Sequence, residues 1–289
     1  MEVPATSANL GPGFDSLGVA LEWTARLHVS IVDEPVAGPA SPIGRMTVAA
    51  VSALYGQAGV ELPAGITATY EGDIPVGRGL GLSAAARVAG LVAANALMEG
   101  GHSSETLLRL AVQLEGHADN ATPAMLGSFQ VVVSDDDDFE HLGIEPPDDL
   151  RLALLVPDFS MPTEESRRTL PDRLTRNQAV HNISRAAMLV AAIRERRYEL
   201  LGVATEDVLH QPTRAQLFPP LYAIFQSARD AGALGVYLSG GGSTVAAFAT
   251  EGAEQIAGAM RETAAAHGYQ AETRVCEFST TGAELLAGS

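Results

Sequence analysis

The sequence predicts an α+β protein built from two domains. Its 289 residues can bury a large core, and 46% apolar with 18% charged residues is typical of a globular protein. Segments with strand and helix patterns alternate loosely, without regular βαβ units. This favours helices gathered on one face of largely antiparallel sheets. The turn-forming run 146–149 (Pro-Pro-Asp-Asp) is the best candidate boundary, so we expect domains at 1–147 and 148–289.

The first half contains three expected strands and three expected helices. Apolar and polar residues alternate over 26–32, which predicts a strand with Leu27, Val29 and Ile31 facing inward. Apolar residues at helical spacing and alanine-rich runs predict the helices. The remaining segments are strands at 66–70 and 131–133 and helices at 47–55, 84–98 and 104–116. Four aspartates at 135–138 could attract a cation, but adjacent carboxylates do not converge on one ion, so we expect a solvated turn.

The second half repeats the mixture of strands and helices. It starts with a buried-type strand at 152–156, which is apolar throughout. We expect helices at about 178–195, 198–209, 220–231 and 252–266, and strands at 236–238, 245–248 and 271–278.

The charge composition excludes several kinds of chemistry. All 18 basic residues are arginine, so the chain has no lysine for a P-loop, a protein-kinase strand or a Schiff base. The net charge of -17 argues against nucleic acid or an anionic membrane as a partner.

Other features of the sequence bear on location. Cys276 is the only cysteine, which excludes an internal disulfide. The first residues have no signal-peptide pattern, and the longest nearly apolar run, 88–98, is far shorter than the roughly 20 residues of a membrane span. We therefore expect a cytoplasmic protein.

A glycine-rich segment between an expected strand and an expected helix is the most informative motif. Its alternate glycines allow close approach of the backbone to a ligand, and the following helix directs free N–H groups toward the loop, as in anion sites. A dinucleotide fingerprint would need glycine or alanine at position 82, and a nucleophile elbow would need glycine at position 85. From this loop alone, phosphate binding and a plain tight turn remain equally good interpretations. The segment consists of Pro75, Val76, Gly77, Arg78, Gly79, Leu80, Gly81, Leu82, Ser83, Ala84 and Ala85.

Two further glycine clusters favour the ligand-binding interpretation. One spans 7–18 (SANLGPGFDSLG) and the other spans 239–244 (SGGGST). A hairpin turn rarely needs three consecutive glycines, so a close approach to a ligand or another loop is expected.

These three clusters, in this order, resemble the signature motifs of the GHMP kinases, and the resemblance is greatest to homoserine kinases. It spans nearly the whole chain and includes EGHADNATPAMLGS at 115–128, PTEESRRTLP at 162–171 and LHQPTR at 209–214. The resemblance implies a ribosomal-protein-S5-domain-2-like N-terminal domain, a ferredoxin-like C-terminal domain and a homodimer. It also implies transfer of the γ-phosphoryl group of ATP to the hydroxyl of L-homoserine, which forms O-phospho-L-homoserine for threonine biosynthesis.

The same resemblance implies a role for each site residue. Residues 75–85 would wrap the triphosphate, and Ser83 with Glu115 would hold Mg²⁺, for which hydroxyl and carboxylate oxygens are suitable ligands. Arg167 and Arg214 would bind the substrate carboxylate, because a guanidinium can bind it in a bidentate manner. The other implied substrate residues are Asp15 at the ammonium group, Asn120 at the reacting hydroxyl, and Asn9, His117 and Thr163 along the pocket.

Without the resemblance, plainer interpretations stay open. Glu115 could be an ordinary carboxylate at a helix end, Asn9 and Asp15 could cap a loop, and His117 could be structural. Asp119 could be a base or a structural carboxylate. Arg168 is expected at the surface.

The chain departs from the family pattern at three positions. Leu82 replaces a serine, and Ala118 and Ser243 each replace a proline. Ser83 is retained, so we expect activity to survive; the alternatives are another small-molecule GHMP kinase and a non-catalytic binding protein.

Overall fold

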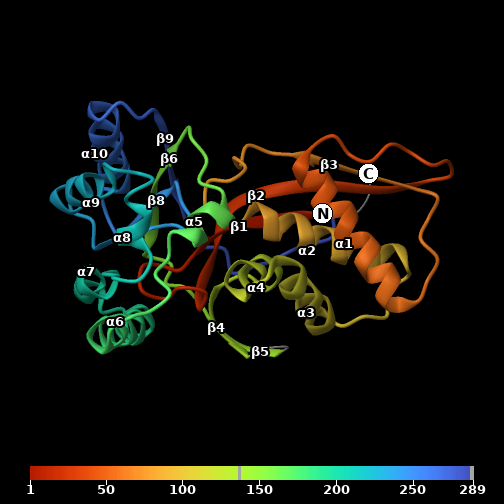
Figure 1. Cartoon of the computed structure of the whole chain (residues 1–289), viewed down its shortest axis with the longest axis horizontal. Helices are drawn as coiled ribbons and strands as arrows, with labels where there is room; N and C mark the ends of the chain where they lie inside the picture. Colours follow the sequence, from red (N-terminus) through yellow and green to blue (C-terminus); the bar gives the residue numbers. More distant parts are fainter. Residues whose placement is uncertain (136–137, 287–289) are drawn as a thin grey trace.

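The computed structural model describes residues 1–135 and 138–286, and these form two antiparallel sheets with helices (Figure 1). The first sheet has the order β1-β2-β4-β5, with β3 also paired to β2. Its strands are β1 (Glu2–Ala8), β2 (Leu17–Val32), β3 (Gly65–Glu71), β4 (Phe129–Asp135) and β5 (Asp138–Ile144). The helices of this part are α1 (Pro42–Ala58), α2 (Leu82–Leu97), α3 (Ser104–Glu115) and α4 (Ala118–Leu126).

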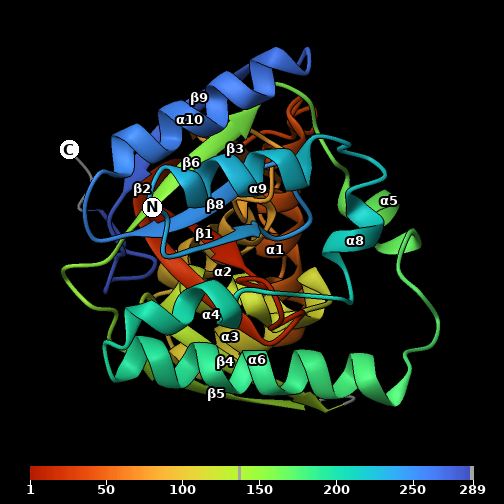
Figure 2. The ribbon, with the colours of Figure 1, turned by 90° about the vertical axis from the view of Figure 1, so that its left-hand side faces the viewer.

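The second sheet has the order β7-β8-β6-β9 and is also antiparallel. Its strands are β6 (Arg151–Pro157), β7 (Gly235–Leu238), β8 (Val245–Ala249) and β9 (Ala271–Cys276). Helices α9 (Leu221–Asp230) and α10 (Ala253–Ala266) lie side by side over this sheet, while α6 (Arg176–Arg194) crosses the opposite side of the molecule (Figure 2). Shorter elements are α5 (Thr163–Arg168), η1 (Tyr198–Leu200), α7 (Leu201–Ala204) and α8 (Gln211–Arg214).

The second sheet is buried on both faces. Leu152 and Leu154 of β6 belong to the large core shared with the first sheet. Ala153 and Leu155, which alternate with them, face a second core beneath α9 and α10. Burial on both faces explains why β6 is apolar throughout instead of alternating.

The segment after β9 returns to the first sheet. Phe278 pairs with Leu21 of β2, and Glu284 pairs with Glu2 of β1. The two sheets are therefore joined by a common core and by the end of the described chain.

The predicted α+β class is confirmed, but some local expectations are wrong. Ile31 is 41% exposed, because the last residues of β2 extend past the core that buries Leu27. The expected helix at 198–209 is only η1 and α7. It ends because the Asp207 carboxylate accepts hydrogen bonds from the backbone N–H groups of Leu209, His210 and Gln211 and so starts a separate turn, α8. The sequence patterns did not reveal β1, β5, α4, α5 or α8.

Two further expectations concern the aspartate run and the membrane. Asp135 pairs with Asp138 where β4 meets β5, and Asp136 and Asp137 lie outside the described residues. Across the described ranges, every helix is too short or too polar to cross a membrane.

Candidate active site

The three glycine clusters meet at a cavity of about 400 Å³ that contains most of the expected site residues. Residues 75–83 form one wall, and Ala84 and Ala85 are buried behind it in α2. Thr163 begins α5, and its side chain lies outside the described part of the chain. The other expected residues on the cavity wall are Asn9, Asp15, Glu115, His117, Asp119, Asn120, Arg167 and Arg214. Phe14, Ile43, Met46 and Ser160 also line it and were not predicted.

The glycine loop has the backbone geometry that its composition suggested. Gly77, Gly79 and Gly81 all have positive φ values, of 70°, 75° and 65°. Helix α2 follows directly, with Gly81 as its N-cap. The loop therefore presents backbone amides and the N-terminus of a sixteen-residue helix to the cavity.

The third glycine cluster holds this loop in place. Ser239 Oγ donates to the Gly79 carbonyl at 2.7 Å, and the Thr244 amide donates to the Arg78 carbonyl at 3.1 Å. A Cβ atom on Gly79 would lie 2.1 Å from the Ser239 carbonyl oxygen. Residues 239–244 thus act as a support for the loop, and their close approach explains why position 79 needs glycine.

The Arg78 guanidinium donates hydrogen bonds to backbone carbonyl oxygens. Its Nε donates to Pro157 O at 2.9 Å, and its Nη2 donates to Asp158 O at 2.5 Å. The side chain therefore fastens the glycine loop to the end of β6.

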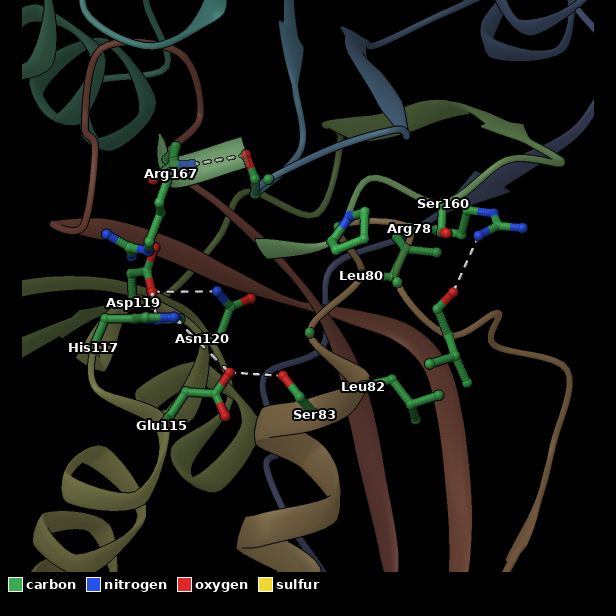
Figure 3. Close-up of a pocket in the computed structure, with 18 of the residues that line it drawn as sticks. Arg78, Leu80, Leu82, Ser83, Glu115, His117, Asp119, Asn120, Ser160 and Arg167 are labelled. Carbon is green, nitrogen blue, oxygen red and sulfur yellow. Dashed lines mark hydrogen bonds and ion pairs between the residues drawn. The ribbon is translucent and has the colours of Figure 1, made fainter. Parts of the chain in front are cut away.

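Ser83 and Glu115 lie together at the start of α2 (Figure 3). Ser83 Oγ donates to Glu115 Oε1 at 2.6 Å, and Arg87 forms an ion pair with Glu115 Oε2. His117 Nδ1 is 2.8 Å from Asp119 Oδ1, and its Nε2 is 3.9 Å from Glu115 Oε1. Burial opposes protonation of His117, but these two carboxylates outweigh it and raise the pKa of the imidazole.

Asn120 has a fixed amide orientation. Its Oδ1 accepts a hydrogen bond from Thr6 Oγ1 at 2.8 Å, and its Nδ2 donates to Asp119 Oδ1 at 3.2 Å. Thr6 on β1 is fully buried and was not predicted from the sequence. It holds the amide where the glycine loop meets the rest of the cavity.

Asp15 and Arg167 form a bidentate ion pair, with Nη1–Oδ2 and Nη2–Oδ1 distances of 2.9 and 2.6 Å. The hydrogen bond with Asp15 raises the pKa of the Arg167 guanidinium. Asn9 supports this loop, because its Oδ1 accepts from the Asp15 amide and its Nδ2 donates to the Gly240 carbonyl. Asn9 is thus a loop-capping residue in this structure as well as part of the wall.

Arg214 is 2% exposed and has few partners for a buried cation. Its Nη1 donates to His210 Nδ1 and to the Gly240 carbonyl, both at 2.8 Å. Its Nε has no hydrogen-bond partner among the described residues. Burial, and then the charge of Arg167, lower the pKa of Arg214 to about 10. The Phe14 ring lies under both guanidinium groups, at 5.2 Å from Arg167 Cζ and 5.5 Å from Arg214 Cζ.

The three residues that depart from the family pattern, at positions 82, 118 and 243, all fit the structure without disturbing the cavity wall. Leu82 is buried in the core, and its side chain points away from those of Ser83 and Glu115 (Figure 3). Ala118 is buried at the start of α4. Ser243 Oγ donates to the Phe159 carbonyl at 2.6 Å.

Arg168, next to the cavity residue Arg167, is exposed, as expected from the sequence.

Comparison with known proteins identifies the family. The GHMP kinases N terminal domain matches residues 45–128, and the GHMP kinases C terminal domain matches residues 189–266. The homoserine kinase of Carboxydothermus hydrogenoformans is 39% identical over 279 residues, which cover 93% of this chain and 91% of that protein. The chain belongs to the homoserine kinase family of GHMP kinases. The homoserine kinase of Desulfitobacterium hafniense is 37% identical over 99% of both chains.

A solved structure supports the same relationship. The homoserine kinase from Cytophaga hutchinsonii superposes with a TM-score of 0.86 at 28% identity, covering 97% of this chain and 95% of that one. The GHMP kinase fold is therefore confirmed over nearly the full length. Membership of this kinase family implies the use of ATP.

Proposed function

We propose that the protein transfers the γ-phosphoryl group of ATP to the side-chain hydroxyl of L-homoserine and forms O-phospho-L-homoserine, a step of threonine biosynthesis. The observation that carries this proposal is Arg214, a buried cation on the cavity wall whose Nε has no hydrogen-bond partner among the described residues. A buried guanidinium with a free donor is suited to an anionic ligand.

The charges around Arg214 favour an amino acid over a simple anion. Arg167 lies over the same Phe14 ring, so two guanidinium groups are available to one carboxylate. Asp15, now paired with Arg167, supplies the negative charge that an ammonium group needs. We infer that the substrate carboxylate binds Arg167 and Arg214 and that its ammonium group binds Asp15. A neutral alcohol would leave the buried charge of Arg214 without an anionic partner, because Asp15 is already paired with Arg167.

The opposite end of the cavity suits a triphosphate. The backbone of residues 75–83 and the N-terminus of α2 provide N–H donors, which replace the absent lysine. The oxygen atoms of Ser83 and Glu115, 2.6 Å apart, fit the ligand preference of Mg²⁺ and would hold it. When bound, this ion supplies neutralisation of charge on the phosphate oxygens.

Phosphoryl transfer requires mainly that the acceptor hydroxyl and the γ-phosphoryl group are held in the correct relative positions. The alcohol oxygen bonds to the γ-phosphorus as the bond to the bridging oxygen of ADP breaks, and the hydroxyl proton is released. We place Asn120 at the hydroxyl, because Thr6 fixes its amide and it lies beside the glycine loop. Asp119 already accepts hydrogen bonds from His117 and Asn120, which favours a supporting role for this carboxylate. His117, which lines the cavity, and Thr163 remain proposed contacts of the substrate.

Several broader expectations stay predictions. They are the domain division at 147/148, a homodimer, a cytoplasmic location and the absence of a nucleic-acid partner.

A substrate panel tests the proposed reaction. Purified protein with MgATP is given L-homoserine, mevalonate, diphosphocytidyl-methylerythritol or galactose, and ADP release and phosphorylated product are measured. We expect turnover with L-homoserine only. Preference for another alcohol would indicate a different GHMP kinase, and calorimetric binding of ATP without any turnover would indicate a non-catalytic protein.

A further inference from the structure

His210 links the first glycine cluster to the buried guanidinium of Arg214. Its side chain is 0% exposed and lies in the 209–214 segment. Nε2 is 2.7 Å from the Gly11 carbonyl oxygen, and Nδ1 is 2.8 Å from Arg214 Nη1. A carbonyl can only accept and a guanidinium can only donate, so Nε2 carries the proton and Nδ1 presents its lone pair. The contacts thus define one neutral tautomer.

The surroundings keep this imidazole neutral. Burial lowers the pKa of His210; the carboxylate of Asp207, 3.6 Å from Nε2, opposes this effect, and the charge of Arg214 adds to it. A second proton would sit on Nδ1 and face Arg214 Nη1, which would replace an attractive contact with a repulsive one. His210 therefore acts as an acceptor that tolerates no charge of its own.

A rigid network holds His210 in place. The Asp207 carboxylate accepts the backbone N–H groups of Leu209, His210 and Gln211. It also accepts a hydrogen bond from Asn182 Nδ2, which contacts the Pro12 carbonyl as well. The Phe14 ring lies 5.5 Å from the His210 ring on the cavity side. The segment at 207–214 is thereby tied to the loop that carries Asp15.

We propose that His210 is a positioning residue for the amino-acid substrate: its imidazole joins the Gly11 carbonyl to Arg214 and so fixes the guanidinium and the Asp15 loop relative to each other. The inference rests on the proposed function, because it assigns the carboxylate of L-homoserine to Arg214. The hydrogen bonds found around the glycine loop do not involve His210. Its loss should therefore weaken homoserine binding and leave ATP binding nearly unchanged.

Three substitutions, two of them also combined in a double variant, test this proposal in the full-length protein. His210→Leu removes both hydrogen bonds, whereas His210→Asn keeps an acceptor near the position of Nδ1. We expect His210→Leu to raise KM for L-homoserine at least tenfold, with KM for ATP within twofold of the wild type. His210→Asn keeps the acceptor for Arg214 but loses the donor to the Gly11 carbonyl, so it should raise KM for L-homoserine less than His210→Leu does and leave KM for ATP near the wild-type value. The Arg214→Ala change should raise KM for homoserine by a smaller factor in the His210→Leu background than alone, because the two residues act as a unit.

The outcomes separate this inference from the proposed function. If the wild type does not phosphorylate L-homoserine, the function fails. If the wild type is active but folded His210→Leu keeps its KM for homoserine, or if both KM values rise equally, the positioning role is refuted.

A measurement on the wild type avoids dependence on the folding of a variant. In ¹⁵N-histidine-labelled protein at pH 7, with the His210 signals assigned by His210→Asn, we expect a protonated Nε2 and an unprotonated Nδ1. The Nδ1 signal should shift on addition of L-homoserine and not on addition of MgATP. A protonated Nδ1, or a signal that is insensitive to homoserine, would overturn the inference.

Discussion

Replacing Arg214 by alanine is the sharpest perturbation of the proposed substrate site. The guanidinium is buried, and its Nε lacks a partner among the described residues, so a carboxylate bound there would form charge-assisted hydrogen bonds in a water-poor environment. Truncating one partner of such a pair costs about 2–4 kcal/mol. This corresponds to a rise of roughly 30- to 1,000-fold in KM for L-homoserine, at about 1.4 kcal/mol per factor of ten.

The assay is steady-state ADP release with each substrate varied in turn. KM for ATP should change by less than about threefold, because the glycine loop is held by Ser239, Thr244 and Arg78 and not by Arg214. Arg168→Ala is the matched control, since it removes the same charge from an exposed position beside the site. It should leave both KM values near those of the wild type. Equal increases in both KM values for Arg214→Ala, or a homoserine KM within threefold of wild type, would refute the assignment.

Three further changes test other parts of the site, the first of them with a control substitution in α10 outside the site. Gly79→Ala places a Cβ atom 2.1 Å from the Ser239 carbonyl oxygen, so it should lower Tm and raise KM for ATP. The control Gly258→Ala lies in α10, where a Cβ meets open space, and should raise the free energy of unfolding by about 0.5–1 kcal/mol in thermal unfolding. Leu82→Ser removes a buried core side chain and should lower the free energy of unfolding by about 2–4 kcal/mol in urea titrations; a wild-type value would contradict the burial of Leu82. Glu115→Gln should raise the Mg²⁺ concentration for half-maximal activity at least tenfold, and an unchanged Mg²⁺ dependence would remove Glu115 from the metal site.

The sequence predicted the architecture better than the details of the site. Long periodic segments such as α2 and α10 were located to within a few residues, because their apolar spacing reflects burial. Short elements were missed where tertiary contacts define them: β1 exists through its pairing with β2, and α8 through the Asp207 carboxylate.

The motifs identified the residues around the cavity but not how these residues are held. The Asp15–Arg167 pair joins positions 152 residues apart, and the Thr6–Asn120 bond joins positions 114 residues apart. Neither contact has a local signature in the sequence. The support of Arg214 by His210 lies within one helical turn, but its importance became visible only with the burial of both side chains.

The most direct test of the account is a crystal structure with L-homoserine and a non-hydrolysable ATP analogue. We predict the substrate carboxylate on Arg167 and Arg214, its ammonium group on Asp15, its hydroxyl beside Asn120, and the triphosphate along the backbone of 75–83. A homoserine molecule bound in the opposite orientation, or a triphosphate outside the glycine loop, would contradict it.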